Sequence, residues 1–513
     1  MQLVQVFVVL TILSCGLGIL LNAEALLNSP WFRPDWRSDA TMFRRDLGHA
    51  TEGCSVYVLD PAVELAPRLG LTVCNISDEE FWPHDKEGHG IQAMPRTPHS
   101  AHQHGGGYWI AEALRHSPLR VNDSSVADII FVDMHCYHSW FISYLRRGSD
   151  IEALASPKRV MVASLKELFS RPEQIRGGGS HLAYYLPIPA SVTVYGQFLE
   201  LEMRRSMQLV LEQGFLGRSV RESKLRDHEA LVLPYSSTAD IDPSLPLLPD
   251  GRDIFVFFRA GCSASKDRSA GIIMRAKLIE AIEAASPPAT DVDVACTCSV
   301  CPGHISHVES QERLMRSVYC PVLAGDTQAS ARLTEVILAG CLPVFVGPPW
   351  HTMPLIDEID YRTFGTFIRV ADTSPYVIKN EAAGTSNIMS WTVTPEADIE
   401  DLVVEVETLA DVLPALRRIH PSEREAKFAA MLSVKNLFWY PPLPGTNESA
   451  LGDVVINHLC AHGKRATRLD KARGLPEGQG HRGRAVDGVT MDLSAIAEAR
   501  NEAVRRKNKW IGK

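Results

Sequence analysis

Arg332 and Glu335 are the two side chains whose types and spacing most clearly suggest binding chemistry in this sequence. Residues three apart on a helix project from neighbouring points of one face. A guanidinium is always charged and its fork of donors suits a diphosphate, whereas a carboxylate suits a pair of sugar hydroxyls. The pair therefore predicts a nucleotide held by its phosphates and its ribose. An ion pair on a solvated helix is the alternative interpretation.

The elements around this pair form a strand, a turn, a helix and a second strand. An apolar run over 318–323 predicts a buried strand, and another follows over 342–346. Asp326 and Thr327 are good N-cap residues, and apolar residues at helical spacing then predict a helix of about three turns that ends at Gly340. In such a βαβ unit, the amides at the helix start can hold an anion where the first strand ends.

A second unit of the same kind comes earlier in the chain. The run 253–259 predicts a buried strand, and an amphipathic helix is expected over 271–284 after a glycine-containing turn. Arg275 lies near the start of this helix, where it either binds phosphate or is surface charge. Because both units would belong to one parallel sheet, we expect Arg275 to support the site of Arg332.

Length and composition indicate a globular protein of two domains. The 513 residues suffice for two cores, and the proline-rich run 242–250 is a good linker. The formal net charge of -9 gives no reason to expect nucleic acid as a partner. Beyond residue 462 the chain becomes basic and rich in glycine, which is typical of a solvated or disordered tail, with contact to anionic polysaccharide or lipid as the alternative.

The N-terminus predicts entry into the secretory pathway. Residues 3–21 form an apolar run without charge, which is about the length that spans a bilayer. Ala23, Glu24 and Ala25 have the form of a signal-peptidase site, so this segment is either a cleaved signal peptide or an uncleaved signal anchor. In both cases the bulk of the chain is expected on the luminal or extracellular side.

Three sequons agree with that compartment. Asn75, Asn122 and Asn447 each begin an N-x-Ser sequence and are predicted N-glycosylation sites.

The cysteines are open to two interpretations. Cys296, Cys298 and Cys301 are close enough in sequence to bind a metal, with His304 or His307 as a fourth ligand. No second cluster matches them, and an oxidising lumen favours disulfides.

The residues around Arg332 resemble the C-terminal signature of the exostosin-like glycosyltransferases, glycosyltransferase family 47. That signature runs as an aromatic residue and Cys, Gly-Asp-Thr, Ser, Arg-Leu, an acidic residue, Gly-Cys-x-Pro-Val and a later proline. The matching residues here are Tyr319, Cys320, Gly325, Asp326, Thr327, Ser330, Arg332, Leu333, Glu335, Gly340, Cys341, Pro343, Val344 and Pro354. As one departure, Leu323 replaces the family's proline before the Gly-Asp loop, with Pro321 nearby instead.

The resemblance implies an α/β fold of GT-B type, in which two Rossmann-like domains face a cleft, with an N-terminal transmembrane signal anchor. The expected divisions are a signal anchor or signal peptide over 1–25, a stem over 26–54, an N-terminal acceptor domain over 55–250, a C-terminal nucleotide-sugar-binding domain over 251–445, and a basic, partly disordered tail over 446–513.

The resemblance also implies an enzyme that moves a sugar from a UDP-sugar to a glycan or glycoprotein acceptor. Inversion is expected, without a bound metal or other cofactor. Arg332 and Arg275 would neutralise the diphosphate, and Glu335 would hold the ribose. The loop would add contacts from Gly325, Asp326, Thr327 and Ser330.

Such a reaction needs a base, because the acceptor hydroxyl loses its proton as it attacks. The segment 127–133 predicts a buried strand that leads to Asp133 and His135, at the sheet edge where α/β folds place their ligands. These two residues are the candidate catalytic bases, and the alternative is that they cap a strand and meet solvent. Asp-x-Asp triplets that begin at Asp240 and Asp291 could hold a divalent ion, but chance occurrence is the favoured interpretation.

By resemblance, the expected location is the Golgi, as a single-pass type II membrane protein with a luminal catalytic domain. A hetero- or homo-oligomer with another glycosyltransferase is also compatible with the family. Three alternative functions are a non-catalytic glycan-binding or partner-activating subunit, a retaining enzyme on the same fold, and a secreted protein without a nucleotide site.

Overall fold

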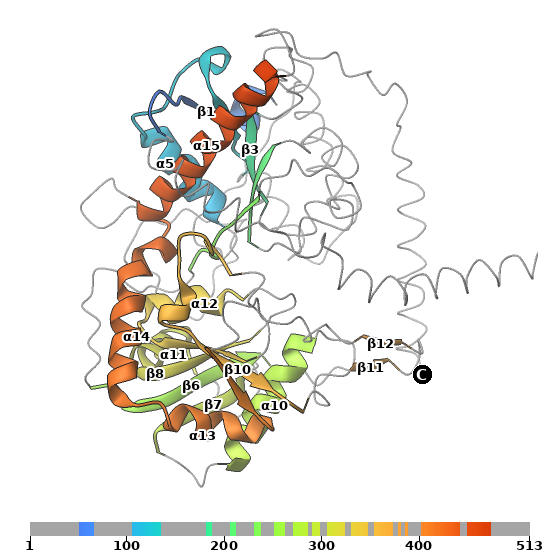
Figure 1. Ribbon diagram of the computed structural model, residues 1–513, viewed down its shortest axis with the longest axis vertical. Coiled ribbons are helices and arrows are strands. Elements are labelled where there is room, and N and C mark those ends of the chain that lie inside the picture. Colours follow the sequence, from blue (N-terminus) through green and yellow to red (C-terminus); the bar gives the residue numbers. More distant parts are fainter. Residues whose placement is uncertain are drawn as a thin grey trace, which may run out of the picture.

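A computed structural model describes most of two α/β halves of the chain (Figure 1). The described residues are 51–65, 105–134, 181–186, 206–211, 230–237, 251–261, 270–285, 290–297, 305–323, 330–346, 353–372, 378–380, 385–387, 402–441 and 449–472. The expected signal anchor and stem up to residue 50 therefore lie outside the description.

The N-terminal half contains a parallel sheet of five strands in the order β1-β2-β3-β4-β5. The strands are β1 (Val56–Leu59), β2 (Ile129–Val132), β3 (Leu182–Leu186), β4 (Met207–Val210) and β5 (Ala230–Val232). Every residue of β2, β3 and β4 is buried, as expected for parallel strands covered on both faces. Helix α5 (Gly106–His116) packs against β1 and β3, and the short helices are α3 (Pro61–Glu64) and η2 (Ser124–Val126).

The C-terminal half contains a second parallel sheet, of six strands in the order β13-β10-β9-β8-β6-β7. The strands are β6 (Ile254–Gly261), β7 (Val292–Thr297), β8 (Ser317–Val322), β9 (Leu342–Val346), β10 (Thr366–Val370) and β13 (Val403–Val406). The chain runs from β6 to β7 on one side and then places β8 on the other side of β6. The carboxyl ends of β6 and β8 therefore form a topological switch point, where open α/β sheets bind their ligands.

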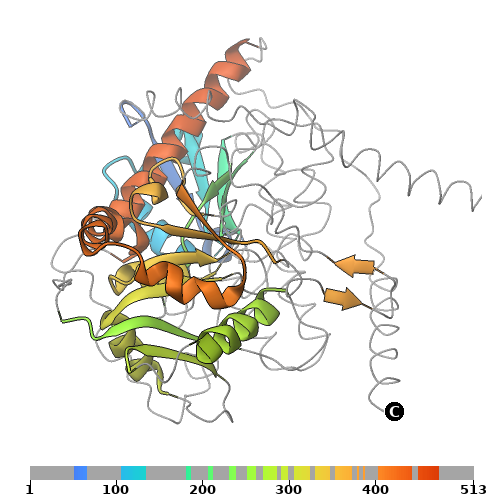
Figure 2. The same cartoon turned by 60° about the horizontal axis from the view of Figure 1, so that its bottom comes forward.

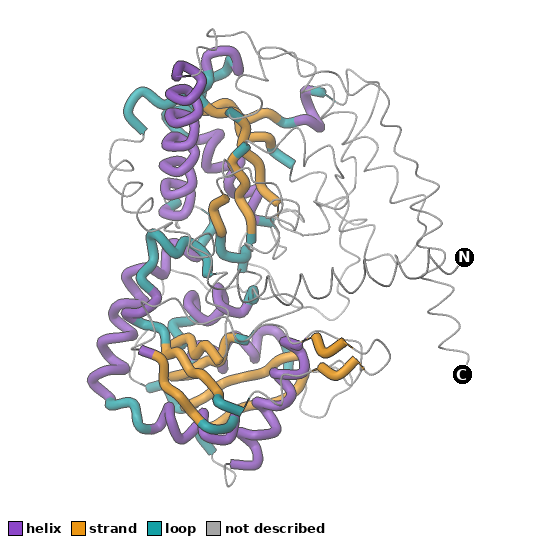
Figure 3. Tube along the Cα trace, turned by 45° about the vertical axis from the view of Figure 1, so that its right-hand side comes forward, coloured by secondary structure: helices purple, strands orange, loops and turns teal. Residues whose placement is uncertain are grey.

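Helices and one small sheet complete this half. The helices are α10 (Ala270–Ala285), α11 (His307–Met315), α12 (Arg332–Leu338), α13 (Val412–Arg417) and α14 (Pro421–Val434), with short turns η7 (Tyr361–Thr363), η10 (Leu409–Asp411) and η11 (Lys435–Phe438). An antiparallel pair joins β11 (Ile378–Asn380) to β12 (Thr385–Asn387). Figure 3 shows the two parallel sheets as separate groups of strands, each with its own helices. This mixed α/β architecture with parallel sheets is consistent with the expected GT-B type.

Helix α15 (Ala450–Ala472) leaves the C-terminal half and returns to the N-terminal sheet. It contacts α5 and β2, and Figure 2 shows it running along the N-terminal strands. A disulfide joins Cys460 on this helix to Cys54, just before β1. The structure thus differs from the expected tail over 446–513, because residues 450–472 form a helix that completes the N-terminal half.

The described helices contain none with the length and apolar character needed to cross a bilayer.

Candidate functional site

Helix α12 carries the predicted pair and is shorter than expected. It begins at Arg332, with Ala331 at the N-cap position, and it spans seven residues rather than about three turns. The expectation that Asp326 or Thr327 caps this helix is therefore wrong; both residues lie outside the described part of the chain, as does Gly325. The predicted end is confirmed, since Gly340 follows the helix with a φ of 71°, a conformation that glycine adopts without strain.

Arg332 reaches from the start of α12 across to β6. Its guanidinium donates from Nη1 to the carbonyl of Arg259 at 3.3 Å and from Nη2 to the carbonyl of Phe257 at 3.5 Å. The rings of Phe257 and Phe258 lie 5.4 and 5.5 Å from the guanidinium carbon. The side chain therefore occupies the switch point between β6 and β8. Its Nε is buried and has no hydrogen-bond partner among the described residues.

A carboxylate and a second guanidinium lie close enough to Arg332 to affect its pKa. Burial lowers the pKa of Arg332 to about 10, Glu335 opposes that shift, and the second guanidinium of Arg275 lowers the pKa further. Arg332 nevertheless keeps its charge at neutral pH. Two guanidiniums that are close enough to repel each other favour an anion between or beside them. The structure thus brings together the predicted residues Arg275, Arg332 and Glu335.

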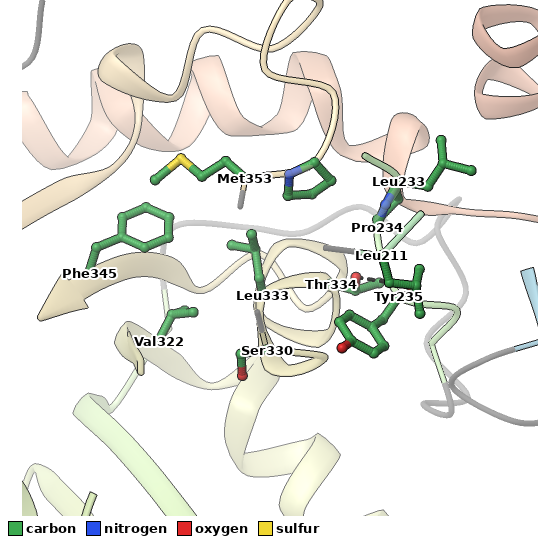
Figure 4. Close-up of a pocket in the computed structure, with 11 residues that line it drawn as sticks. Leu211, Leu233, Pro234, Tyr235, Val322, Ser330, Leu333, Thr334, Phe345 and Met353 are labelled. Atoms are coloured by element: carbon green, nitrogen blue, oxygen red, sulfur yellow. Dashed lines mark hydrogen bonds between the residues drawn. The ribbon is translucent and has the colours of Figure 1, made fainter. Parts of the chain in front are cut away.

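A pocket lies between the two halves, on another face of α12 (Figure 4). Its lining combines residues that follow β4 and β5 with residues of β8, α12, β9 and the segment after β9. These are Leu211, Leu233, Pro234, Tyr235, Val322, Ser330, Leu333, Thr334, Phe345, Met353 and Pro354. The predicted site residue Ser330 lines this pocket, whereas Arg332 and Glu335 are not part of its lining. Helix α12 therefore presents different residues to the interdomain pocket and to β6.

On the N-terminal sheet, Asp133 follows β2 and is buried, with 1 % of its surface exposed. Arg115 of α5 donates to its carboxylate at 2.5 Å and also bonds Glu112 at 2.8 Å. Burial by itself would lower the pKa of Arg115, but Asp133 and Glu112 raise it above the ordinary value. The carboxylate of Asp133 thus forms an ion pair and does not meet solvent, whereas the Arg115 side chain is partly exposed. His135 lies outside the described residues.

Sequence reasoning missed this ion pair. Arg115 and Asp133 are 18 residues apart on different elements, so no spacing rule links them. The ion pairs of the second Asp-x-Asp triplet were likewise not predicted. Asp291 bonds Arg417, and Asp293 bonds both Arg259 and Arg313. These two carboxylates are neutralised by arginines, and the triplet at Asp240 lies outside the described residues.

Disulfides occur among the cysteines singled out from the sequence. Cys320 in β8 is bonded to Cys341, which precedes β9, so the two cysteines of the resemblance form one bridge. Cys296 is also disulfide-bonded, which removes it from a thiolate metal site. Cys298 and Cys301 lie outside the described residues.

Among the predicted sequons, the described residues include Asn122, whose side chain is exposed in a surface turn before η2. Asn75 and Asn447 lie outside the description.

Comparison with known proteins identifies the family. No curated protein matches the chain. The family model described as the exostosin GT47 domain matches residues 50–380, a span that runs from the lead into β1 to the end of β11 and contains Asp133, Arg275, Arg332 and Glu335. The match covers more than half of the 513 residues and includes both parallel sheets except for β13. The chain therefore belongs to the exostosin GT47 family of glycosyltransferases.

Proposed function

We propose that this protein transfers a sugar from a UDP-sugar donor to a glycan or glycoprotein acceptor, with inversion at the sugar carbon. The observation that supports a nucleotide donor most directly is Arg332 at the switch point of the C-terminal sheet, close enough to Arg275 for the two charges to interact. As the sugar leaves, negative charge grows on the diphosphate, and preorganised guanidiniums stabilise it without reorganisation.

The roles follow from the positions of the three charged residues. Arg332 and Arg275 neutralise the diphosphate, and Glu335, three residues beyond Arg332 on α12, accepts hydrogen bonds from the ribose. Gly325, Asp326, Thr327 and Ser330 are proposed to surround the phosphates from the preceding loop. Two guanidinium charges can take the place of a divalent ion, so the proposed reaction needs no metal or other cofactor.

Binding of UDP tests this proposal without knowledge of the sugar or the acceptor. Isothermal titration with Arg332→Ala should show affinity for UDP reduced by about 30- to 100-fold, which corresponds to the loss of about 2–3 kcal/mol from charge-assisted hydrogen bonds. Glu335→Gln should weaken UDP more than 2′,3′-dideoxy-UDP, because the diol then has a neutral amide oxygen in place of a charged carboxylate as its acceptor. Arg316→Ala is the matched control, since Arg316 is an exposed arginine of the same half that bonds Asp253.

Wild-type protein that does not bind UDP, or Arg332→Ala protein that binds it normally, would contradict the proposal. UDP released from a panel of UDP-sugars by the wild-type chain would then identify the donor. UDP binding without turnover would instead favour the non-catalytic subunit.

We also propose a luminal location in the Golgi, with membrane attachment through the N-terminal segment. The disulfides Cys54–Cys460 and Cys320–Cys341 support an oxidising compartment, and the exposed Asn122 is available for glycosylation. When the protein is expressed in eukaryotic cells, peptide N-glycosidase should remove its N-glycans and increase its mobility in gel electrophoresis. Unchanged mobility would argue against this location.

A further inference from the structure

Helix α12 bonds to the N-terminal half through a residue that has no part in the proposed nucleotide contacts. Thr334 stands between Arg332 and Glu335 in the sequence, and its side chain is 1 % exposed. Its Oγ1 donates to the carbonyl of Tyr235 at 3.0 Å, a bond drawn as a dashed line in Figure 4. Tyr235 follows β5 of the other sheet. A single helix of seven residues thus carries the proposed nucleotide ligands and a bond to the opposite half.

The segment that receives this bond is held at three carbonyls by the C-terminal half. The Leu355 amide donates to the carbonyl of Val232 at 2.8 Å, and the Tyr440 hydroxyl donates to that of Pro234 at 2.6 Å. Together with the Thr334 bond, these contacts mean that segment 232–235, at the end of β5, accepts hydrogen bonds from three separate parts of the other half. Of these three donors, the one on α12 lies next to the residues proposed to hold the nucleotide.

Helix α12 is packed firmly enough to move as a unit. Val336, Ile337 and Leu338 are fully buried, and Leu333 is 7 % exposed. A packed helix has few alternative arrangements, so a displacement of Arg332 toward a ligand also displaces Thr334. The hydroxyl of Thr334 then transmits that displacement to segment 232–235, because it is bonded to the Tyr235 carbonyl and a partly buried carbonyl that loses its donor loses a favourable bond.

We infer that Thr334 is a positioning residue that couples occupancy of the nucleotide site to the N-terminal half through the carbonyl of Tyr235. This inference rests on the proposed function, because it takes UDP as the ligand of the Arg332 face. It assigns to Thr334 no contact with the nucleotide. When UDP is bound, the restrained α12 holds segment 232–235 in place, and the acceptor half becomes ordered against the donor half.

Hydrogen exchange measured by mass spectrometry on the full chain, with and without UDP, tests this coupling. In the wild type, UDP should slow exchange in peptides that span 330–339 and also in peptides that span 230–237. Thr334→Val keeps the shape but lacks the hydroxyl, so UDP should still protect 330–339 while protection of 230–237 falls by about tenfold, the factor typical of one buried hydrogen bond. Thr334→Ser retains the hydroxyl and should restore the protection of both.

Thr363→Val is the matched control. The Thr363 hydroxyl also donates to a main-chain carbonyl, that of Asp360 at 2.7 Å, but this bond is local and exposed. The control should therefore lose a similar bond without losing UDP-dependent protection of 230–237.

The outcomes separate the coupling from the proposed function. Protection of 330–339 in the wild type without protection of 230–237 would overturn the coupling alone. So would a Thr334→Val protein that is less stable yet keeps full protection of 230–237, because Thr334 would then be merely structural. Absence of UDP protection even at 330–339 in the wild type would overturn the proposed function and the coupling that depends on it.

Discussion

Asp133 and Arg115 form an ion pair at the end of β2, in which the carboxylate is fully buried and the guanidinium side chain is 24 % exposed. A carboxylate that is bonded to a guanidinium is a weaker base than a free one, and breaking such a pair leaves an uncompensated charge. The proposed roles are therefore His135 as the base and Asp133 as the partner that orders Arg115. The distinction comes from a contact between α5 and the residue after β2, which the sequence pattern could not supply.

The pH dependence of kcat/KM should distinguish the two candidates. With His135 as the base, activity should fall as the solution is acidified, because the protonated ring cannot accept the acceptor's proton. His135→Ala should remove that limb and most of kcat while UDP affinity stays unchanged. Asp133→Asn should instead lower stability by about 1–2 kcal/mol, since Arg115 loses one charged partner but keeps Glu112 at 2.8 Å. Retention of the limb in His135→Ala would refute the assignment.

The charged pair on α12 illustrates what residue patterns can predict. Arg332 and Glu335 were identified from spacing and from the family signature, and in the structure the Arg332 guanidinium donates to carbonyls of β6. The bond from Thr334 to Tyr235 joins residues 99 positions apart, so no local rule could have indicated it.

At the scale of elements, β6, β8 and β9 of the C-terminal half were predictable because parallel strands are continuous apolar runs, whereas β7 and β13 were not predicted. The strands 318–323 and 342–346 expected from the sequence correspond to β8 and β9. The start of α12 was not predictable, since good capping residues at Asp326 and Thr327 were not used. The order of strands could not be predicted either, because it depends on the side of β6 on which β8 is placed after β7.

Gly365, between η7 and β10, tests how closely these elements are packed. A Cβ at this position would lie 2.8 Å from the carbonyl oxygen of Tyr361 and 2.9 Å from the ring of Phe367. Because the main chain cannot give way, Gly365→Ala should reduce the free energy of unfolding by about 2 kcal/mol. Chemical denaturation measures this, with Gly261→Ala as the control, since its Cβ would meet nothing within 4 Å. Equal stability of the two variants would contradict the packing described for β10.

At the scale of the whole molecule, α15 contacts both halves, and the basic composition of the C-terminal region did not predict these contacts. Its position within an expected tail suggested solvent, but it contacts α5 and β2, and its Gly463 approaches the carbonyl of Asp128 so closely that a Cβ would lie 3.0 Å away. His458 on the same helix contacts Glu358 of the C-terminal half. A helix that belongs by sequence to the end of the chain thus packs on both halves, and sequence alone could not indicate this, because the contacts span hundreds of residues.

Removal of each of the two disulfides Cys54–Cys460 and Cys320–Cys341 should have a different effect on the protein. Cys54 and Cys460 are 406 residues apart, whereas Cys320 and Cys341 are separated by 21. In the chain-entropy account, the longer loop contributes about 6 kcal/mol and the shorter one about 3 kcal/mol. Replacement of Cys54 and Cys460 by serine should expose α15 to limited proteolysis while UDP binding persists, because the proposed nucleotide site lies at the other sheet. Replacement of Cys320 and Cys341 should weaken UDP binding first, because that bridge holds β8 to the start of β9 beside α12. If proteolysis of α15 were unchanged in the first variant, the packing of α15 rather than the disulfide would be what holds the N-terminal half to the end of the chain.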